Sequence, residues 1–459
     1  MRFSFLNRFE ERLRLGRLFD SPEGSLAVVY GRRRLGKSRL LQEVLPRGRT
    51  VYYVGDDRES ALQRQGLAAE IGRLLPGFDA VDYPGWDALL DRWWAQAPAG
   101  SVLALDEFPA LVSAASGLPS LLQKHIDSGS RRGIHLILAG SSQRMMHGLF
   151  LDRRAPLFGR ARELLRIEAL AAGWIQPALG IRDAAAAVEA YAVWGGVPRY
   201  WELAADHPDL QAAIRELVLS PLGVLHDEPK SLLLDDLRDT TQAASILALI
   251  GQGSHRLSEI AGRLGKPSTS LSRPLQRLID LGLVRRTMPF GASVRAGGRS
   301  LYRIADPFLS FWFRFVEANR SRLATRQISA VARAVEAGLP RHMGEAWEDL
   351  ARASVPALGC FDRAWGPASR WWGPGRDRTP MEVDVVARSD DDRALLLGEA
   401  EWSPRTDGRR VLSELRRKAE NLPFAEGREV FLAIWHRGSR SGAKDVEEVS
   451  PARVLKLLR

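Results

Sequence analysis

The chain has 459 residues, 45% of them hydrophobic and 26% charged, with a formal net charge of +11 and a single cysteine. This length suits about three or four domains of ~100–200 residues each, and one cysteine, Cys360, excludes an internal disulfide. No apolar run is long enough for a transmembrane helix, and charges interrupt the N-terminus, so we expect a cytoplasmic protein without signal peptide or membrane contact. The basic balance is compatible with a nucleic-acid partner but does not establish one.

The first strong motif follows a short helix predicted from Phe9 to Phe19. A buried strand leads into the sequence GRRRLGKS, which fits the pattern G-x-x-x-x-G-K-[ST] and opens a helix. The two glycines permit backbone conformations in which successive N–H groups surround phosphate oxygens. The lysine is expected to reach the β- and γ-phosphates of ATP, and the serine to hold Mg²⁺. The predicted nucleotide-binding residues are Gly31, Arg32, Arg33, Arg34, Leu35, Gly36, Lys37 and Ser38.

Polar residues follow two further buried strands. The strand at 101–105 ends in Asp106 and Glu107, and the strand at 134–140 ends in Ser141. Asp106 is expected to hold Mg²⁺ through water, and Glu107 to polarise the water that attacks the γ-phosphate. Because ligands lie at the carboxyl ends of parallel strands, Ser141 is predicted to touch the γ-phosphate or this water. The alternative is that the serine caps the helix that follows.

The segments GRRRLGKS, VLALDEFP, LILAGSS and PLFGRARELLRIEAL resemble those of the archaeal-type ATPase family, within the AAA+/STAND group of P-loop NTPases. The resemblance covers about 1–235 and implies an ATPase core at 1–170 and a helical lid at 171–235. It also implies a homo-oligomer in which an arginine before the last core strand completes a neighbour's active site. Arg160 is the matching position and Arg162 the second choice; a surface arginine paired with acids is the alternative.

Residues 236–305 have the pattern of three helices and a hairpin, which resembles a winged helix-turn-helix. The third helix, 268–280, would enter the major groove of duplex DNA. Pro274 should kink this helix or mark its true first turn. Winged helices also serve as protein-docking modules and spacers, so both interpretations stay open. The candidate DNA contacts are Ser268, Thr269, Ser270, Arg273 and Arg277 on the helix, and Arg295 and Arg299 on the wing.

Connecting helices at 306–340 lead to a last domain at 341–459. Glu348 lies on a predicted helix, and Asp384 and Glu399 lie on two predicted strands. This set resembles the PD-(D/E)XK nuclease-like fold and the C-terminal domain of unknown function that the same ATPase family often carries. Three such carboxylates could converge on Mg²⁺.

The tail departs from the nuclease pattern at one position. Glu401 stands where the pattern has a lysine, two residues after Glu399, and a carboxylate there cannot stabilise developing negative charge. Lys418 on the next helix offers a less favoured source of that charge. A degenerate nuclease fold used for binding or scaffolding is therefore favoured over cleavage.

The predicted fold class is α/β: an AAA+-like P-loop NTPase core with a helical lid, a winged helix-turn-helix, and a C-terminal α/β restriction-endonuclease-like domain. We predict an ATPase that binds ATP and Mg²⁺ and acts as a DNA-associated switch or regulator. The alternatives are an ATP-regulated, Mg²⁺-dependent nuclease and a protein-sensing signalling scaffold without nucleic acid.

Overall fold

The structure is a computed structural model that describes residues 4–129, 133–237, 239–292, 300–425 and 427–459. The chain divides into two compact units. The P-loop unit comprises Asn7–Ala169 and Leu234–Arg238, and the tail unit comprises Met1–Leu6, Leu170–Leu233 and Asp239–Arg459. Within the described ranges, no helix has the length and apolar character needed to cross a membrane.

A five-stranded sheet in the order β2-β3-β4-β1-β5 forms the centre of the P-loop unit, and all its pairings are parallel. Strands β1, β3 and β4 are buried along their whole length, which accounts for their continuous apolar sequences. Because β4 lies between β1 and β3, the carboxyl ends of these three strands meet at one edge. The strands are β1 (Leu26–Tyr30), β2 (Thr50–Val54), β3 (Val102–Asp106), β4 (His135–Gly140) and β5 (Ala161–Arg166).

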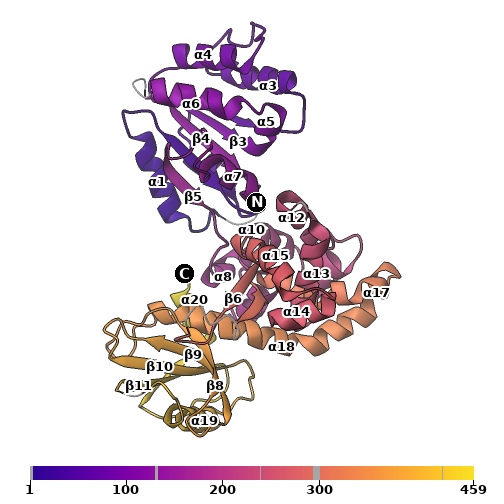
Figure 1. The fold of residues 1–459 in the computed structure, drawn as a ribbon, viewed down its shortest axis with the longest axis vertical. Coiled ribbons are helices and arrows are strands. Elements are labelled where there is room, and N and C mark those ends of the chain that lie inside the picture. Colours follow the sequence, from indigo (N-terminus) through magenta and orange to yellow (C-terminus); the bar gives the residue numbers. More distant parts are fainter. Residues whose placement is uncertain (1–3, 130–132, 238, 293–299, 426) are drawn as a thin grey trace. The chain divides into compact units, whose positions relative to one another are not determined.

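Helices cover both faces of this sheet (Figure 1). Large aromatic side chains fill the space between helices and strands, among them Phe78, Trp93 and Phe108, each 0% exposed. Burying such side chains provides much of the hydrophobic stabilisation of the unit. The helices are α1 (Phe9–Phe19), α2 (Lys37–Val44), α3 (Ser60–Gly72), α4 (Trp86–Gln96), α5 (Phe108–Ala114), α6 (Leu118–Gly129) and α7 (Gln143–Phe150).

The predicted lid is helical throughout most of its length. The glycine pair after α9 is required there, because Gly195 has φ of +59° and a Cβ on Gly196 would lie 2.0 Å from the carbonyl oxygen of Leu170. The elements are η2 (Ala172–Trp174), α8 (Ile175–Leu179), α9 (Ala184–Trp194), α10 (Pro198–Ala204), α11 (Leu210–Ile214), η3 (Arg215–Leu219) and α12 (Glu228–Asp236).

The winged helix has the predicted order of elements: α13 (Thr240–Gly251), α14 (Leu257–Leu264), α15 (Ser268–Asp280), and the antiparallel strands β6 (Val284–Thr287) and β7 (Leu301–Ile304). Helix α15 continues through Pro274, and its buried leucines, Leu271, Leu275 and Leu278, form one stripe facing the core. The wing residues Arg295 and Arg299 lie outside the described residues.

Three short helices lead to one long helix. They are α16 (Pro307–Phe315), η5 (Glu317–Asn319) and α17 (Arg320–Ala324), and they precede α18 (Ile328–Ser354). Helix α18 is continuous across the predicted domain boundary at 340/341, with Pro340 inside it. The last helical turn of this region is η6 (Val355–Ala357).

The C-terminal α/β domain contains a second five-stranded sheet, in the order β12-β11-β10-β9-β8. Helices α18 and α19 lie on opposite sides of it (Figure 1). The elements are β8 (Ser369–Pro374), β9 (Pro380–Arg388), β10 (Ala394–Glu401), α19 (Gly408–Glu420), β11 (Glu429–His436), β12 (Val446–Val449) and α20 (Pro451–Leu457). Pairings among β8, β9 and β10 are antiparallel, and those among β10, β11 and β12 are parallel.

Contacts at both ends of this domain join it to the rest of the tail unit. Phe290, from the wing, donates its backbone N–H to the carbonyl of Arg370 at 2.9 Å, and its ring lies 5.6 Å from the ring of Phe424 in the C-terminal core. At the other end of the domain, the backbone N–H of Gly173 donates to the carbonyl of Leu458 at 3.1 Å. Lid, winged helix and C-terminal domain therefore pack as one body.

Candidate functional site

The loop between β1 and α2 has the conformation that its glycines allow. Gly31 has φ of +149°, and a Cβ there would lie 2.5 Å from the carbonyl oxygen of Ile167, so no larger residue fits. Gly36 has open space around it but φ of +90°, so it is needed for its backbone conformation. The Lys37 ammonium, in a side chain only 5% exposed, donates to the carbonyls of Gly31 at 2.8 Å and Arg32 at 3.1 Å. Burial lowers the pKa of Lys37, while the nearby carboxylates oppose that shift.

The structure brings Ser38 and Asp106 together. The Ser38 hydroxyl donates to Asp106 Oδ2 at 2.6 Å, and the Tyr52 hydroxyl donates to the same oxygen at 2.6 Å. A serine hydroxyl and a carboxylate are hard oxygen ligands, so this donor pair fits Mg²⁺. The motif did not indicate Tyr52, since the alternation of β2 identifies it only as a strand residue. Burial, and then the Asp106 charge, raise the pKa of Tyr52, which keeps the phenol a donor.

Glu107 is held by the strand next to its own. It has left-handed backbone angles, φ 47° and ψ 44°, directly before α5. The Ser141 hydroxyl lies 3.0 and 2.8 Å from its two carboxylate oxygens, and the Ser141 N–H donates to Oε2 at 3.3 Å. The helix cap considered for Ser141 is instead Ser142, whose hydroxyl accepts from the N–H of Met145 at 3.4 Å. Ser141 therefore does not cap the helix, and its hydroxyl is hydrogen-bonded to the carboxylate of Glu107, the expected catalytic residue.

An acidic pair at the end of α12 also lies in the P-loop unit. Asp235 Oδ1 is 3.2 Å from Nη1 of Arg33, and Asp236 Oδ1 accepts from the Ser142 hydroxyl at 3.2 Å and the Arg144 N–H at 3.1 Å. Burial raises the pKa of both aspartates. Sequence reasoning missed this pair, because nothing local shows that a segment after the lid returns to the P-loop.

The two arginines considered for a neighbour's site have partners within this chain. Arg160 directly precedes β5, and its guanidinium forms a bidentate pair with Asp127 of α6 at 2.7 and 2.9 Å. It also donates to the carbonyl of Pro156 at 2.9 Å. Arg162 donates to the Ser21 hydroxyl at 3.0 Å. To complete the site of another subunit, Arg160 would have to break its contact with Asp127.

The acids of the C-terminal domain cluster around Asp384. Burial and the Asp384 charge raise the pKa of Glu348 to about 7 and that of Glu399 to about 8, and they also raise the pKa of Glu401. Asp384 Oδ2 accepts from the backbone N–H of Ala400 at 3.1 Å. Mutual repulsion and desolvation therefore make the ionised cluster costly without a cation.

Basic side chains near the acidic cluster supply part of the positive charge that the cluster needs. The Lys418 ammonium lies 2.7 Å from Glu399 Oε1, while Arg352 and Arg370 lie 3.6 and 3.8 Å from Glu348 Oε2. In the part of the chain that the structure describes, no group of three or more His, Cys, Asp or Glu side chains is arranged to hold a metal ion. The expected set Glu348, Asp384 and Glu399 is therefore close together but is not a ligand set in this conformation.

The predicted recognition helix α15 presents polar residues to solvent. Ser268, Thr269, Ser270 and Arg273 are exposed, whereas Arg277 is partly buried. The Ser270 hydroxyl is used locally, since it donates to the carbonyl of Pro267 at 2.7 Å. Of the two arginines on this helix, Arg273 is therefore the exposed one.

Comparison with known proteins identifies two segments. Residues 241–287 match the IclR helix-turn-helix domain, and residues 312–411 match a family described as archaeal and bacterial proteins of unknown function. Over 442 residues the chain is 25% identical to the uncharacterized protein MJECL04 of Methanocaldococcus jannaschii, covering 94% of this chain and 95% of that protein.

The fold is shared with a solved structure. The Walker-type ATPase PABY2304 of Pyrococcus abyssi superposes with a TM-score of 0.52 at 19% identity, covering 68% of this chain and 96% of that one. The Aeropyrum pernix ORC2 protein matches with a TM-score of 0.41 at 19% identity, covering 73% and 96%. The chain therefore has a P-loop ATPase fold, followed by a winged helix and a C-terminal α/β domain. This confirms the archaeal-type ATPase resemblance expected from the sequence.

Proposed function

We propose that the protein binds and hydrolyses ATP and uses the cycle as a DNA-associated switch. One observation carries the proposal: at the shared edge of β1, β3 and β4, the Ser38–Asp106 pair lies beside a Glu107 carboxylate that Ser141 holds in place. A metal-binding pair beside an oriented carboxylate is the combination that phosphoryl transfer to water requires.

Each residue of this edge has a distinct task. The N–H groups of the loop from Gly31 to Gly36 bind phosphate oxygens, and Lys37 exchanges its two carbonyl contacts for phosphate oxygens. Ser38 and Asp106 would hold Mg²⁺, which when bound neutralises phosphate charge. Glu107 orients the attacking water and accepts its proton, and Ser141 fixes the carboxylate.

The acidic end of α12 supports the switch. Arg33 is paired with Asp235 in this structure, and ATP phosphates would compete for the same guanidinium. Helix α12 begins at Glu228 in the tail unit and ends in the P-loop unit. A change at Arg33 would therefore act on the end of α12 through Asp235. We further propose that Arg160 of a second copy completes the site, after leaving Asp127.

The test is the ATP hydrolysis rate of the full chain with and without duplex DNA, at low and moderate salt, with Lys37→Ala as the blank. The proposal expects a Lys37-dependent rate that DNA stimulates and that loses this stimulation as salt rises, because phosphate contacts weaken steeply with salt. A Lys37-dependent rate that is indifferent to DNA would favour the protein-sensing scaffold. No Lys37-dependent rate would refute the ATPase itself.

A second candidate function, an ATP-regulated Mg²⁺-dependent nuclease, is favoured by the 2.7 Å contact of Lys418 with Glu399. This lysine supplies from α19 the positive charge that Glu401 cannot. The test is nicking of supercoiled plasmid with Mg²⁺ by the wild-type chain and by Glu399→Ala and Lys418→Met. The nuclease would be supported if both variants lose nicking while Lys37→Ala, assayed without ATP, keeps it. Nicking unchanged in both variants, or absent from the wild type, would exclude it.

A further inference from the structure

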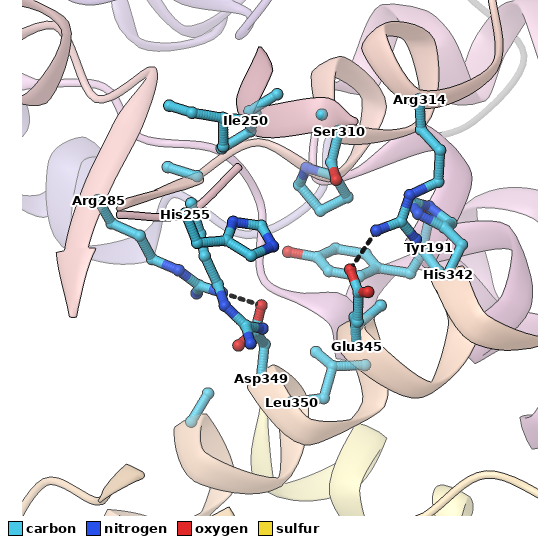
Figure 2. A pocket seen from close by; sticks show the side chains of 18 residues that line it. Tyr191, Ile250, His255, Arg285, Ser310, Arg314, His342, Glu345, Asp349 and Leu350 are labelled. Atoms are coloured by element: carbon cyan, nitrogen blue, oxygen red, sulfur yellow. Dashed lines mark hydrogen bonds and ion pairs between the residues drawn. The ribbon is translucent and has the colours of Figure 1, made fainter. Parts of the chain in front are cut away.

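A cavity of about 240 Å³ lies within the tail unit, among the lid helix α9, the winged helix, α16 and α18. Tyr191 comes from α9, Arg285 from β6 and Glu345 from α18. Figure 2 shows the Tyr191 hydroxyl and the His255 ring directed toward one another, with Arg285 and Arg314 approaching from opposite sides. Elements distant in sequence thus line one cavity with both polar and apolar walls.

The charges that line this cavity do not balance. Arg285 pairs with Asp349, and Arg314 pairs with Glu345 at 2.5 Å. Arg303, from β7, is the third guanidinium in the lining, and its side chain makes no hydrogen bond or ion pair with any described residue. Burial lowers its pKa, which reflects the cost of holding this charge away from water. Among the described lining residues, three guanidiniums thus accompany two carboxylates, and the charges of Glu348 and Asp349 attract Arg303 without pairing with it.

Several hydrogen-bonding atoms around the cavity also lack partners among the described residues. Arg285 Nε and Arg314 Nη1 are buried donors without an acceptor. His342 is 3% exposed and donates from Nε2 to the carbonyl of Ala192 at 2.8 Å, which leaves Nδ1 as a buried acceptor without a donor. Buried polar atoms are costly when unpaired, so a site with donors around one unmatched acceptor indicates a missing polar partner.

We propose that this cavity binds a small oxyanion that also carries a hydrogen-bond donor, either a hydroxycarboxylate or a protonated phosphate. The oxyanion would accept from Arg303, Arg285 and Arg314, and the donor would meet His342. Burial lowers the pKa of His342 to about 4, so its imidazole is neutral at pH 7, and Nδ1 accepts while Nε2 donates to Ala192.

The cavity walls limit the size of the ligand. Ile250, Pro307 and Leu350 form apolar parts of the lining, and the volume is below the range of about 300–1,000 Å³ common for drug-sized ligands. The occupant is therefore a metabolite-sized acid rather than a nucleotide. Bound there, it would touch lid, winged helix and α18 together and would act as an effector of the tail unit.

Isothermal titration calorimetry on the full chain tests the site, with Lys37→Ala as the background because it weakens phosphate binding at the P-loop. The probes are lactate, propionate, propane-1,2-diol and inorganic phosphate. Lactate or phosphate is expected to bind, with lactate tighter than propionate, which lacks the donor, and propanediol not binding. Binding by lactate alone would identify a carboxylate ligand, and binding by phosphate alone a phosphate ligand.

Two variants locate the binding. Arg303→Met should raise the Kd of the bound anion at least about tenfold, because a hydrogen bond to a charged group is lost. Ala346→Leu, which keeps every charge but adds bulk to the lining, should also block binding. No saturable binding of either anion, equal binding of propanediol, or unchanged binding in a folded Arg303→Met or Ala346→Leu protein would overturn the proposal.

Discussion

Ser141→Ala tests the proposed role of this serine in positioning the Glu107 carboxylate. The variant removes the hydroxyl that lies 3.0 and 2.8 Å from the Glu107 oxygens and keeps the weaker N–H contact at 3.3 Å. A hydrogen bond to a charged group is worth about 1.5–3 kcal/mol, and about 1.4 kcal/mol corresponds to a factor of ten in rate. We therefore expect kcat for ATP hydrolysis to fall about 10- to 100-fold, which does not exceed the lower end of the 10²–10⁴ that general-base catalysis contributes.

The assay is steady-state phosphate release, with the Kd for ATP measured separately by equilibrium binding. The Kd should stay within about twofold, since Ser141 touches the carboxylate and not the loop from Gly31 to Gly36. Ser141→Thr, which keeps a hydroxyl, should restore most of the rate. The matched control is Ser142→Ala, which should lower the melting temperature through the lost helix cap but leave kcat nearly unchanged. A rise in kcat for Ser141→Ala would refute the reasoning, because it would mean that Ser141 restrains Glu107.

Three further predictions concern other parts of the chain. Arg160→Ala should leave ATP affinity near normal and cut hydrolysis at least about a hundredfold, as expected of an arginine finger; an equal loss of affinity would contradict that role. Arg273→Ala should weaken duplex binding in fluorescence anisotropy and reduce the salt slope by about 1 if it contacts a phosphate; an unchanged isotherm would show that α15 does not meet DNA. For Glu399, burial keeps the proton on the folded protein up to about pH 8, against an ordinary pKa of 4.5 in the unfolded chain. The free energy of unfolding of the wild type should therefore fall as the pH rises between these values. In Glu399→Gln, the difference in this free energy between pH 5 and pH 8.5, measured by urea unfolding, should be smaller by on the order of 1–3 kcal/mol. Parallel pH profiles for both proteins would contradict it.

The local parts of the fold follow from the sequence. The P-loop strand, its glycines and the helix from Lys37 are recognisable because one short segment contains the whole motif. The three helices of the winged helix were likewise predictable, because each has its own apolar period and α14 ends at Gly265. These features depend on neighbours in the chain, which a sequence displays directly.

Features that depend on distant segments could not be predicted in the same way. Tyr52 shares the Asp106 oxygen only because β2 lies next to β3, and Asp235 meets Arg33 only because the chain returns after the lid. Similarly, α18 continues through Pro340, where local rules expect a break, because packing on both sides of the proline outweighs its cost. Tertiary contacts therefore decide what local propensity leaves open.

The docking of the wing has a consequence for how this architecture is inherited. The ring of Phe290 is 5.6 Å from the ring of Phe424 and 5.3 Å from the guanidinium of Arg388, so one aromatic side chain of the winged helix packs against the core of another domain. A gene fragment ending between the two domains would leave this ring in water and a gap in the core that it fills. We therefore expect that the helix-turn-helix cannot be exchanged on its own without loss of stability, and that recombination preserves folding best when both domains are transferred together.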